Sequence, residues 1–387
     1  MTSKKTDCVH AGQRDGRILP QIDLSTISPI RDLSSAIDDI SKLNAGEQSV
    51  HSSIYSRLHN DTVFCFEAAL AKVEEAEAVV SFSSGMAAIT ALILDAVNRG
   101  GHIIGCRPIY GGTDSLLTAN YLSANVTWCH PVEVSQHIQH NTALIMIETP
   151  ANPTCTLTDI KAVAQEANGI PLSVDSTFAT PYLQHPLALG AQFSIHSATK
   201  FIGGHSDVLA GAIACREEDA KRLRKIRLMT GATLHPLSAY MLHRGLQTLH
   251  LRVEAAQQNA MRLAERLRAH PAIERLYYPD AKDPLIGTQM LGTGSMMAFT
   301  LKGGFEAAQS LMGAVQLITP AVSLGSVESL IQHPAGLTHR NVSEASKLDG
   351  GISDALIRFS VGVEEGEDLW TDLNQALNKV IRSLAAT

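Results

Sequence analysis

The chain has 387 residues, which corresponds to about two or three domains with sizeable buried cores and excludes a peptide-sized binding module. Hydrophobic residues make up 45% of the sequence and charged residues 18%, and the mean hydropathy is +0.04, values typical of a globular chain and not of a disordered or collagen-like one. The net charge of -7 excludes a general affinity for nucleic acid or anionic membrane, and no apolar run approaches the length of a membrane helix.

Targeting and metal signals are also missing from the sequence. The start, Met1–Asp7, is rich in Lys, Thr and Ser without an apolar core, so we expect a cytoplasmic protein and no secretory signal. Six cysteines are spread along the chain without C-x-x-C spacing, which predicts reduced core thiols. His130, His137 and His140 lie close together but have no cysteine or acidic partner at ligand spacing, so no metal site is expected.

The first half of the chain alternates between short apolar runs and helical patterns. Residues 1–58 contain Pro20 and Pro29 and show little periodicity, which predicts an arm that lies on another surface. A helical pattern from Thr62 follows, and a second one ends at Arg99-Gly100-Gly101. Short buried strands are predicted at Ala78–Phe82, His102–Cys106, Leu144–Glu148, Leu172–Asp175 and Phe193–His196. This β–α alternation predicts a mostly parallel sheet with helices on both faces.

The composition changes past about Leu251. The basic stretch Lys221–Arg227, which follows the acidic run Glu217–Asp219, is interpreted as a solvated helix face. A smaller α+β domain is then predicted, with a long charged helix at Arg252–Arg268, strands at Met296–Leu301 and Leu356–Val361, and a last helix at Glu367–Ala385. We therefore expect an arm at 1–58, a large domain at 59–250 and a small domain at 251–387.

Open parallel sheets bind ligands beyond the carboxyl ends of their strands, so the residues that follow each strand are candidates for a site. Neither G-x-G-x-x-G nor G-x-x-x-x-G-K-[ST] occurs, which argues against dinucleotide and P-loop sites. Ser84 and Gly85 at a helix start offer backbone N–H groups to a phosphate, and Ser197 and Thr199 can add hydroxyls. Each of these is equally compatible with an ordinary helix cap or loop.

Two charged residues at strand ends have possible chemical roles. Asp175 ends an apolar strand, where a carboxylate needs a cationic partner; a helix cap or a salt bridge would satisfy it equally. Lys200 precedes the uncharged stretch Phe201–Gly204, and partial burial there would lower the pKa of its amine and make it a nucleophile or Schiff-base former. An ordinary lysine without a catalytic role is the alternative.

Seven short motifs occur in order along the chain: Tyr55-Ser56-Arg57, Ser84-Gly85-Met86, Tyr110–Thr113, Glu148–Pro153, Asp175–Phe178, Ser197–Lys200 and Arg358–Gly362. Together they resemble the pyridoxal 5′-phosphate (PLP) enzymes of cysteine and methionine metabolism, which include cystathionine γ-synthase, cystathionine lyases and methionine γ-lyase. The resemblance extends from about Cys8 to the C-terminus. It implies the α/β, aspartate-aminotransferase-like fold of type I, with a mostly parallel sheet domain and a smaller C-terminal α+β domain. It also implies a homotetramer of two tight dimers with shared active sites.

The resemblance further implies a role for each matched residue. Lys200 would hold PLP as a Schiff base and then move carbon-bound protons, Asp175 would pair with the pyridine N–H, and Tyr110 would stack on the ring and protonate the leaving group. Arg358 would bind the substrate carboxylate with help from Asn152 and Ser323. Further contacts to the cofactor are expected from Ser84, Gly85, Met86, Thr177, Ser197 and Thr199, and from Tyr55 and Arg57 of a neighbouring subunit, where Arg57 could lower the pKa of Tyr110.

Three positions differ from the pattern of relatives. Ile54 and Val322 stand where relatives that handle cystathionine often have Glu, which disfavours a cationic distal group and favours a methionine γ-lyase-like pocket. Gly112 stands where many methionine γ-lyases have Cys, which leaves the substrate open.

The expected function is the α,γ-elimination of a γ-substituted L-amino acid, through a vinylglycine-type intermediate. The substrate would resemble methionine or homocysteine, or be a halogenated, unsaturated or canavanine-like amino acid. One alternative is a γ-replacement synthase of the cystathionine γ-synthase or O-acylhomoserine sulfhydrylase type. The other alternative is a paralogue that keeps the fold but only binds a ligand.

Overall fold

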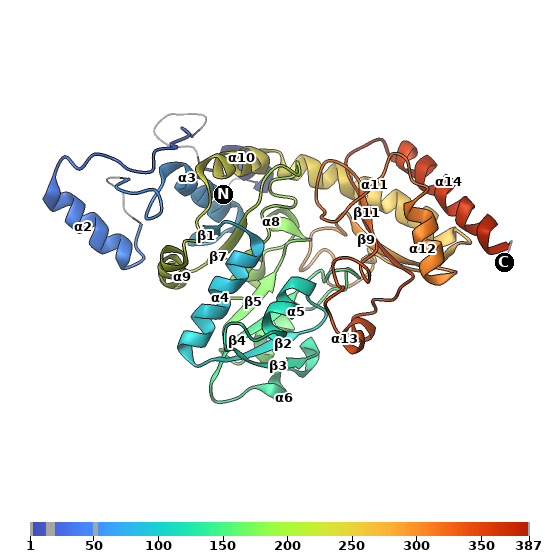
Figure 1. The fold of residues 1–387 in the computed structure, drawn as a ribbon, viewed down its shortest axis with the longest axis horizontal. Coiled ribbons are helices and arrows are strands. Elements are labelled where there is room, and N and C mark those ends of the chain that lie inside the picture. The colour runs from blue at the N-terminus through green and yellow to red at the C-terminus, as the bar shows by residue number, and fades with distance from the viewer. Residues whose placement is uncertain (1–2, 13–19, 49–52, 386–387) are drawn as a thin grey trace.

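The structure, a computed structural model, describes residues 3–12, 20–48 and 53–385, and it contains two β-sheets with helices packed around them (Figure 1). The elements up to residue 247 are α1 (Lys4–His10), α2 (Leu33–Asn44), α3 (Asp61–Glu74), β1 (Ala78–Phe82), α4 (Gly85–Arg99), β2 (His102–Cys106), α5 (Gly111–Thr118), β3 (Asn125–Cys129), α6 (Val134–His137), β4 (Thr142–Glu148), α7 (Ile160–Glu166), β5 (Leu172–Asp175), α8 (Thr180–Leu183), β6 (Phe193–His196), β7 (Gly211–Cys215), α9 (Glu217–Thr230) and α10 (Pro236–Gln247). The remaining elements are α11 (Leu249–Ala269), β8 (Ile273–Tyr277), β9 (Met296–Leu301), α12 (Gly304–Met312), β10 (Thr319–Pro320), β11 (Leu330–Gln332), α13 (Glu344–Asp349), β12 (Leu356–Ser360) and α14 (Gly366–Ala385).

The large sheet has the strand order β1-β7-β6-β5-β4-β2-β3, and every neighbouring pair is parallel except the two that involve β7. Apolar residues fill its strands because helices cover both faces; β4, for example, is buried along almost its whole length. The predicted α/β fold with a mostly parallel sheet is therefore confirmed. The sequence analysis missed β3, whose residues are mostly half-buried, and the antiparallel β7.

Parallel pairing determines where the strands end. Glu148, the last residue of β4, is the register partner of Asp175, the last residue of β5, and the neighbouring β6 ends at His196. The segments that follow these strands thus meet at one edge of the sheet. This edge faces the second half of the chain.

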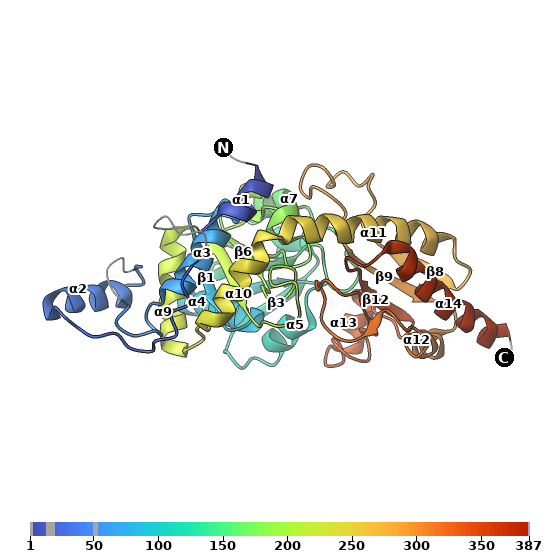
Figure 2. The same cartoon turned by 90° about the horizontal axis from the view of Figure 1, so that it is seen from above.

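The second sheet has the order β10-β11-β12-β9-β8, with β12 at its centre. Its core includes apolar side chains of α11 and α14, and Figure 2 shows these two helices beside the second sheet. The first part of α11 packs into the core of the large sheet through Leu249 and Val253, and its last part packs into the second core through Leu263 and Leu267. A division of the chain at 250/251 stays a proposal, and α11 would cross it.

The N-terminal segment has two different parts. Helix α1 packs against α3 and α10, with Cys8 buried in the large core, so the first helix belongs to the body of the molecule. Helix α2 instead projects from the body in both views (Figures 1 and 2). None of the described helices has both the length and the hydropathy that crossing a membrane requires.

The interpretation of Lys221–Arg227 as a solvated helix face is wrong for the arginines of α9. Arg224 is buried and bonded to Glu217 and to the carbonyl of Gly46. Arg227 donates to Glu67 Oε1 at 2.5 Å. The run looked solvated because sequence shows charge but not the Glu67 carboxylate and the Ser81 carbonyl that α3 and β1 bring near Arg227.

Glu67 is the centre of this buried contact. The side chain is 3% exposed, and its Oε1 also accepts hydrogen bonds from the backbone N–H and the hydroxyl of Ser81, at 2.8 and 2.7 Å. Burial by itself raises the pKa of Glu67, but Arg227 and Ser81 outweigh burial, so the pKa lies below its usual value. The pair thereby joins α3, β1 and α9.

Replacing Glu67 should destabilise the fold strongly. Glu67→Gln leaves the Arg227 guanidinium buried without its counter-charge, a loss of about 3–5 kcal/mol in unfolding free energy. Because the folded-state pKa of Glu67 is lowered, this contribution is present above the unfolded pKa and disappears as the pH falls through the folded one. Urea unfolding followed by circular dichroism at several pH values measures both effects. The exposed pair Arg266–Glu367 provides the control, since Glu367→Gln should leave stability almost unchanged; equal effects of the two variants would contradict the prediction.

Candidate active site

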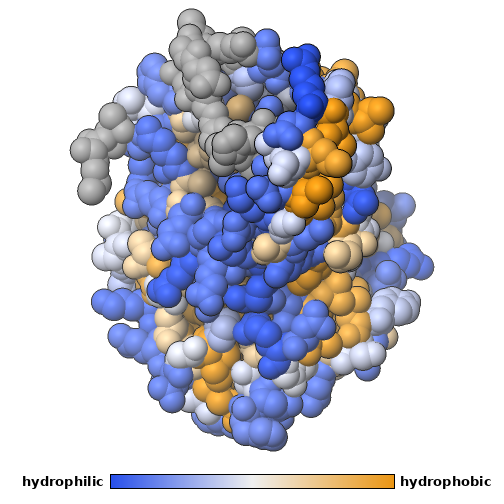
Figure 3. All heavy atoms as spheres, turned by 90° about the vertical axis from the view of Figure 1, so that its left-hand side faces the viewer, coloured by the Kyte–Doolittle hydropathy of each residue, from blue (hydrophilic) through white to orange (hydrophobic). Residues whose placement is uncertain are grey.

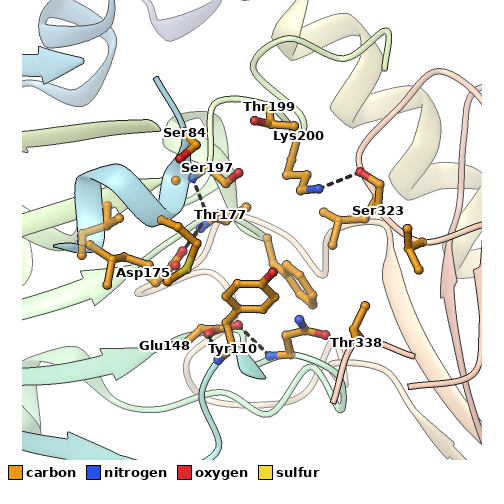
Figure 4. Close-up of a pocket in the computed structure, with 18 of the residues that line it drawn as sticks. Ser84, Tyr110, Glu148, Asp175, Thr177, Ser197, Thr199, Lys200, Ser323 and Thr338 are labelled. Carbon is orange, nitrogen blue, oxygen red and sulfur yellow. Dashed lines mark hydrogen bonds between the residues drawn. The ribbon is translucent and has the colours of Figure 1, made fainter. Parts of the chain in front are cut away.

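A cavity of about 470 Å³ lies at the carboxyl ends of β4, β5 and β6, and residues of the second half of the chain close its other side (Figure 4). Most of the candidate residues line it, from segments far apart in sequence. They are Ser84, Gly85, Met86, Tyr110, Asn152, Asp175, Thr177, Ser197, Thr199, Lys200, Val322, Ser323 and Arg358.

The amine of Lys200 lies inside the cavity. It donates a hydrogen bond of 2.7 Å to the hydroxyl of Ser323, which comes from the opposite wall (Figure 4). Burial, and after it the charge of Arg358, lowers the pKa of Lys200 to about 8. Part of the amine is therefore neutral near neutral pH and can act as a nucleophile or as a base.

Asp175 is held in position by the next turn of the chain. Its Oδ1 accepts hydrogen bonds from the backbone N–H of Thr177 at 3.0 Å and from the Thr177 hydroxyl at 2.5 Å. That hydroxyl in turn accepts the N–H of Ser197 at 2.9 Å. Burial raises the pKa of Asp175, although Thr177 opposes the shift. Asp175 forms no salt bridge within the part of the chain that the structure describes, so a ligand cation facing this carboxyl would keep it ionised.

The start of α4 and the loop after β6 form a cradle for an anion. Ser84 caps α4 by accepting the N–H of Ala87 at 3.1 Å, and Gly85 and Met86 begin this helix of 15 residues. Ser197 faces Gly85, and a Cβ at Gly85 would lie 3.0 Å from the Cβ of Ser197. Glycine therefore keeps the space between the helix start and the Ser197 hydroxyl open. Backbone N–H groups and hydroxyls at a helix start are suited to a phosphate.

Arg358 lies on β12 and is 2% exposed. It donates to the Asn152 side-chain oxygen at 3.0 Å and to the Ser323 carbonyl at 2.5 Å. Burial lowers the pKa of Arg358 to about 10, and in the described structure no carboxylate forms a salt bridge with it. The guanidinium can therefore bind the carboxylate of a ligand by donating hydrogen bonds to it.

Tyr110 precedes α5, and its ring projects into the cavity (Figure 4). Burial and the nearby Glu148 raise the pKa of the phenol, against a lowering effect of Arg358, so the group stays protonated and can serve as an acid. The sequence analysis expected Arg57 of a neighbouring subunit to lower the pKa of Tyr110. Within a single chain, Arg57 does not line the cavity.

Glu148 is a residue of this site that the sequence analysis did not assign. Its Oε2 accepts the N–H of Tyr110 at 2.6 Å and its Oε1 accepts the N–H of Asn152 at 2.8 Å. Burial, followed by the charge of Asp175, raises the pKa of Glu148 well above its usual value. One buried carboxyl thus fixes the backbone of both Tyr110 and Asn152. Its position as the last residue of a buried strand was the signal that could have revealed it.

Four candidate residues do not line the cavity. Ile54, Tyr55 and Arg57 belong to the N-terminal segment, where Arg57 donates to the carbonyl of Leu228 at 2.9 Å. Gly112 lies behind Tyr110, and a Cβ there would lie 2.5 Å from Cε1 of the Tyr110 ring. A larger residue at position 112 would therefore displace the ring.

The cavity also has an apolar wall, of which the sequence analysis indicated Val322 but neither leucine. Leu209, Val322 and Leu337 line it and are 68%, 52% and 48% exposed. Glu148 and Asp175 are the only acidic residues that line it in the described part of the chain. No group of three or more His, Cys, Asp or Glu side chains in the described ranges is arranged to hold a metal ion.

These features fit PLP. The cradle at Gly85 and Ser197 suits its phosphate, the Asp175 carboxyl suits the pyridine nitrogen, and the Lys200 amine suits the aldehyde. Gly85 provides the most direct observation, because any side chain there would fill the space for the phosphate.

Comparisons with known proteins agree with this interpretation. Residues 5–378 match the family described as Cys/Met metabolism PLP-dependent enzyme. The L-methionine gamma-lyase of Brevibacterium sandarakinum is 47% identical over 97% of both chains, and the cystathionine gamma-lyase of Bacillus subtilis is 43% identical over 84% of this chain and 89% of that protein. A cystathionine gamma synthase structure from Xanthomonas oryzae pv. oryzae, in complex with aminoacrylate and cysteine, is 33% identical, covers 99% of both chains and has a TM-score of 0.90.

Sequence, fold and cavity are therefore consistent with one another. The large parallel sheet and smaller second sheet are those of fold type I, and the match covers nearly the whole chain. The chain belongs to the Cys/Met metabolism PLP-dependent enzymes, and it is a lyase that uses PLP for γ-elimination.

Proposed function

We propose that the substrate is an L-amino acid with an uncharged γ-substituent, of the methionine or homocysteine type. The observation that supports this most directly is the apolar wall of Leu209, Val322 and Leu337 on the cavity that holds Lys200 and Arg358. The two acidic residues of the cavity have other partners, since Glu148 accepts backbone N–H groups and the Asp175 carboxyl would face the pyridine nitrogen of PLP. A cationic distal group would therefore find no free carboxylate there.

Each of the cavity residues has a different role in the elimination. PLP, when bound, supplies an electron sink for negative charge at Cα. Arg358, held by Asn152 and the Ser323 carbonyl, binds the substrate carboxylate and fixes Cα. The neutral Lys200 amine, once the substrate has released it from PLP, takes the proton from Cα and then one from Cβ, and the Ser323 hydroxyl can orient that amine. The Tyr110 phenol donates a proton to the leaving γ-substituent.

Turnover of a substrate panel tests this proposal. The holoenzyme should release 2-oxo acid and ammonia from methionine and homocysteine faster than from cystathionine. Lys200→Ala should remove activity on every substrate and the absorbance of the lysine-bound cofactor, because no other amine lines the cavity. Failure on all sulfur substrates with turnover of a halogenated or guanidino-oxy amino acid would contradict the proposed substrate class while leaving the reaction type intact.

A γ-replacement synthase is the second candidate, because a cystathionine gamma synthase shares the fold over 99% of both chains. Both activities need the same base and carboxylate clamp. Incubating the enzyme with an O-acylhomoserine, with and without a thiol, separates them: a thioether product indicates replacement, and 2-oxo acid alone indicates elimination.

Glu148 should affect Tyr110 without touching the reacting atoms. Glu148→Gln keeps the shape of the side chain but replaces one acceptor oxygen with a donor that faces an N–H. We expect kcat to fall about 10- to 100-fold, since a buried N–H left without its acceptor costs about 1–3 kcal/mol, and we expect the kcat of Tyr110→Phe to fall by about 100-fold or more. Steady-state kinetics measure both. Glu133→Gln is the matched control, because Glu133 also accepts a backbone N–H, at 3.0 Å from His130, but lies outside the cavity; a normal kcat for Glu148→Gln would refute the positioning role.

We also propose that the enzyme is a tetramer of two dimers, in which Tyr55 and Arg57 complete the site of the neighbouring chain. Among the described residues, Lys200 and Arg358 are the only cations that line the cavity, and neither has a hydrogen bond to the phosphate cradle there. The arm exposes a series of apolar side chains: Ile22, Leu24, Ile27, Ile30, Leu33 and Ile37. Figure 3, which views the molecule from this side, shows hydrophobic patches between hydrophilic regions. A second copy of the chain would cover them.

Mixing two inactive variants tests the shared site. Arg57→Ala should weaken PLP binding and lower activity, and Lys200→Ala should be inactive. Dimers re-formed from an equal mixture should recover about a quarter of wild-type activity, because half of the random dimers are hybrids with one complete site. No recovery from the mixture, with each variant folded, would place Arg57 in its own chain's site.

The cysteines support a further proposal, that the enzyme works in a reducing compartment such as the cytoplasm. All six are free thiols, and Cys8, Cys106, Cys155 and Cys215 are buried. Proteins of oxidising compartments commonly pair such residues in disulfides.

A further inference from the structure

Two of the free cysteines lie side by side near the active site. Cys106 is the last residue of β2 and Cys129 the last residue of β3, and the two are register partners on adjacent parallel strands. Their sulfur atoms are 3.9 Å apart and share a hydrogen bond. No other pair among the free cysteines shows such a contact in the described structure.

The two thiols differ in reactivity. Cys106 is buried and Cys129 is half-buried. The hydrogen bond from the Cys106 thiol lowers the pKa of Cys129, against the opposing effects of burial and Glu133, whereas the same bond and burial raise the pKa of Cys106. Cys129 is thus the thiol that an oxidant would reach first as a thiolate, with Cys106 next to it as a resolving thiol.

The geometry of the strands allows a bond between them. Adjacent strands lie about 4.8 Å apart, and disulfides join residues whose Cα atoms are about 4.4–6.8 Å apart. The strand spacing therefore meets the Cα condition for a disulfide, and the sulfurs, 3.9 Å apart, would have to close to about 2.05 Å.

The pair also lies at the base of the segment that holds Tyr110. Arg107, directly after Cys106, donates its backbone N–H to the carbonyl of Cys129 at 3.2 Å and its Nε to Asp114 at 2.6 Å. Its guanidinium stacks on Trp128, 4.0 Å from the ring centroid. Tyr110 follows three positions later, at the start of α5. A covalent bond at this point would constrain the chain between β2 and the Tyr110 ring.

We propose that Cys106 and Cys129 form an oxidation site, at which hydrogen peroxide converts the thiol pair into a reversible disulfide that lowers activity through the Tyr110 segment. The Cys129 thiolate attacks peroxide and releases hydroxide, which gives a sulfenic acid. The Cys106 thiol then displaces water from that sulfur and forms the S–S bond. In total, two thiols and one peroxide give one disulfide and two waters. A low-molecular-weight thiol reduces the bond again.

Peptide mapping of the holoenzyme after mild peroxide treatment tests the site. We expect one crosslinked peptide that contains both cysteines, lost on treatment with dithiothreitol and absent from Cys106→Ser and Cys129→Ser. Burial raises the pKa of Cys8 to about 11 and that of Cys155 to about 12, so these thiols should stay unmodified, and Cys155→Ser should still form the crosslink. Unmodified Cys106 and Cys129, or Cys129 oxidised to sulfinic acid without a crosslink, would overturn the proposal.

The coupling to Tyr110 has its own measurement. In wild type, kcat should fall about tenfold on oxidation and return with dithiothreitol, since displacement of a catalytic group by about 1 Å can cost up to about 100-fold. Cys129→Ser should show no such reversible loss. A crosslink that leaves kcat unchanged would overturn the coupling. This readout rests on the proposed function. The crosslink is detected by its mass, so that test does not depend on the proposed function.

Discussion

The parallel pairing of β4, β5 and β6 is the constraint on which the active site depends. It makes Glu148 and Asp175 register partners and places the Lys200 loop, which follows β6, beside them. The helices on both faces bury these strands, and Glu148 at the end of β4 and Arg358 across the cavity are themselves buried. The charged groups there therefore act on one another more strongly than they would at a surface.

That burial shifts the pKa values of the base and of the acid in opposite directions. The pKa of Lys200 is lowered, so its amine can accept protons, and the pKa of Tyr110 is raised, so its phenol can deliver one. Glu148 and Asp175 are adjacent carboxyls with raised pKa values, and each is oriented by backbone N–H groups. A base and an acid with separated pKa values in one cavity are what a reaction with successive proton transfers needs.

Much of this site could be predicted because its chemistry follows local sequence. A carboxylate at the end of an apolar strand and a lysine in a Ser-x-Thr-Lys loop made Asp175 and Lys200 candidates, and the order of the seven motifs indicated the family and thereby their roles. Glu148 was missed because its partners, the N–H groups of Tyr110 and Asn152, meet it only after β2 and β4 pair. Arg227 was misread for a similar reason, since Glu67 lies on a different helix.

The sequence by itself thus determined most of the elements and the mostly parallel sheet, because periodicity depends on neighbours in the chain, and its seven ordered motifs indicated the family and, through that resemblance, the cofactor and most residues of the cavity. Only the tertiary structure decided which of those residues face one another. It placed Ser323 against Lys200, brought Arg358 from β12 to Asn152, and put the sulfurs of Cys106 and Cys129 3.9 Å apart. Such contacts join residues from distant segments, so their distances follow from strand pairing and domain packing, which no local pattern encodes.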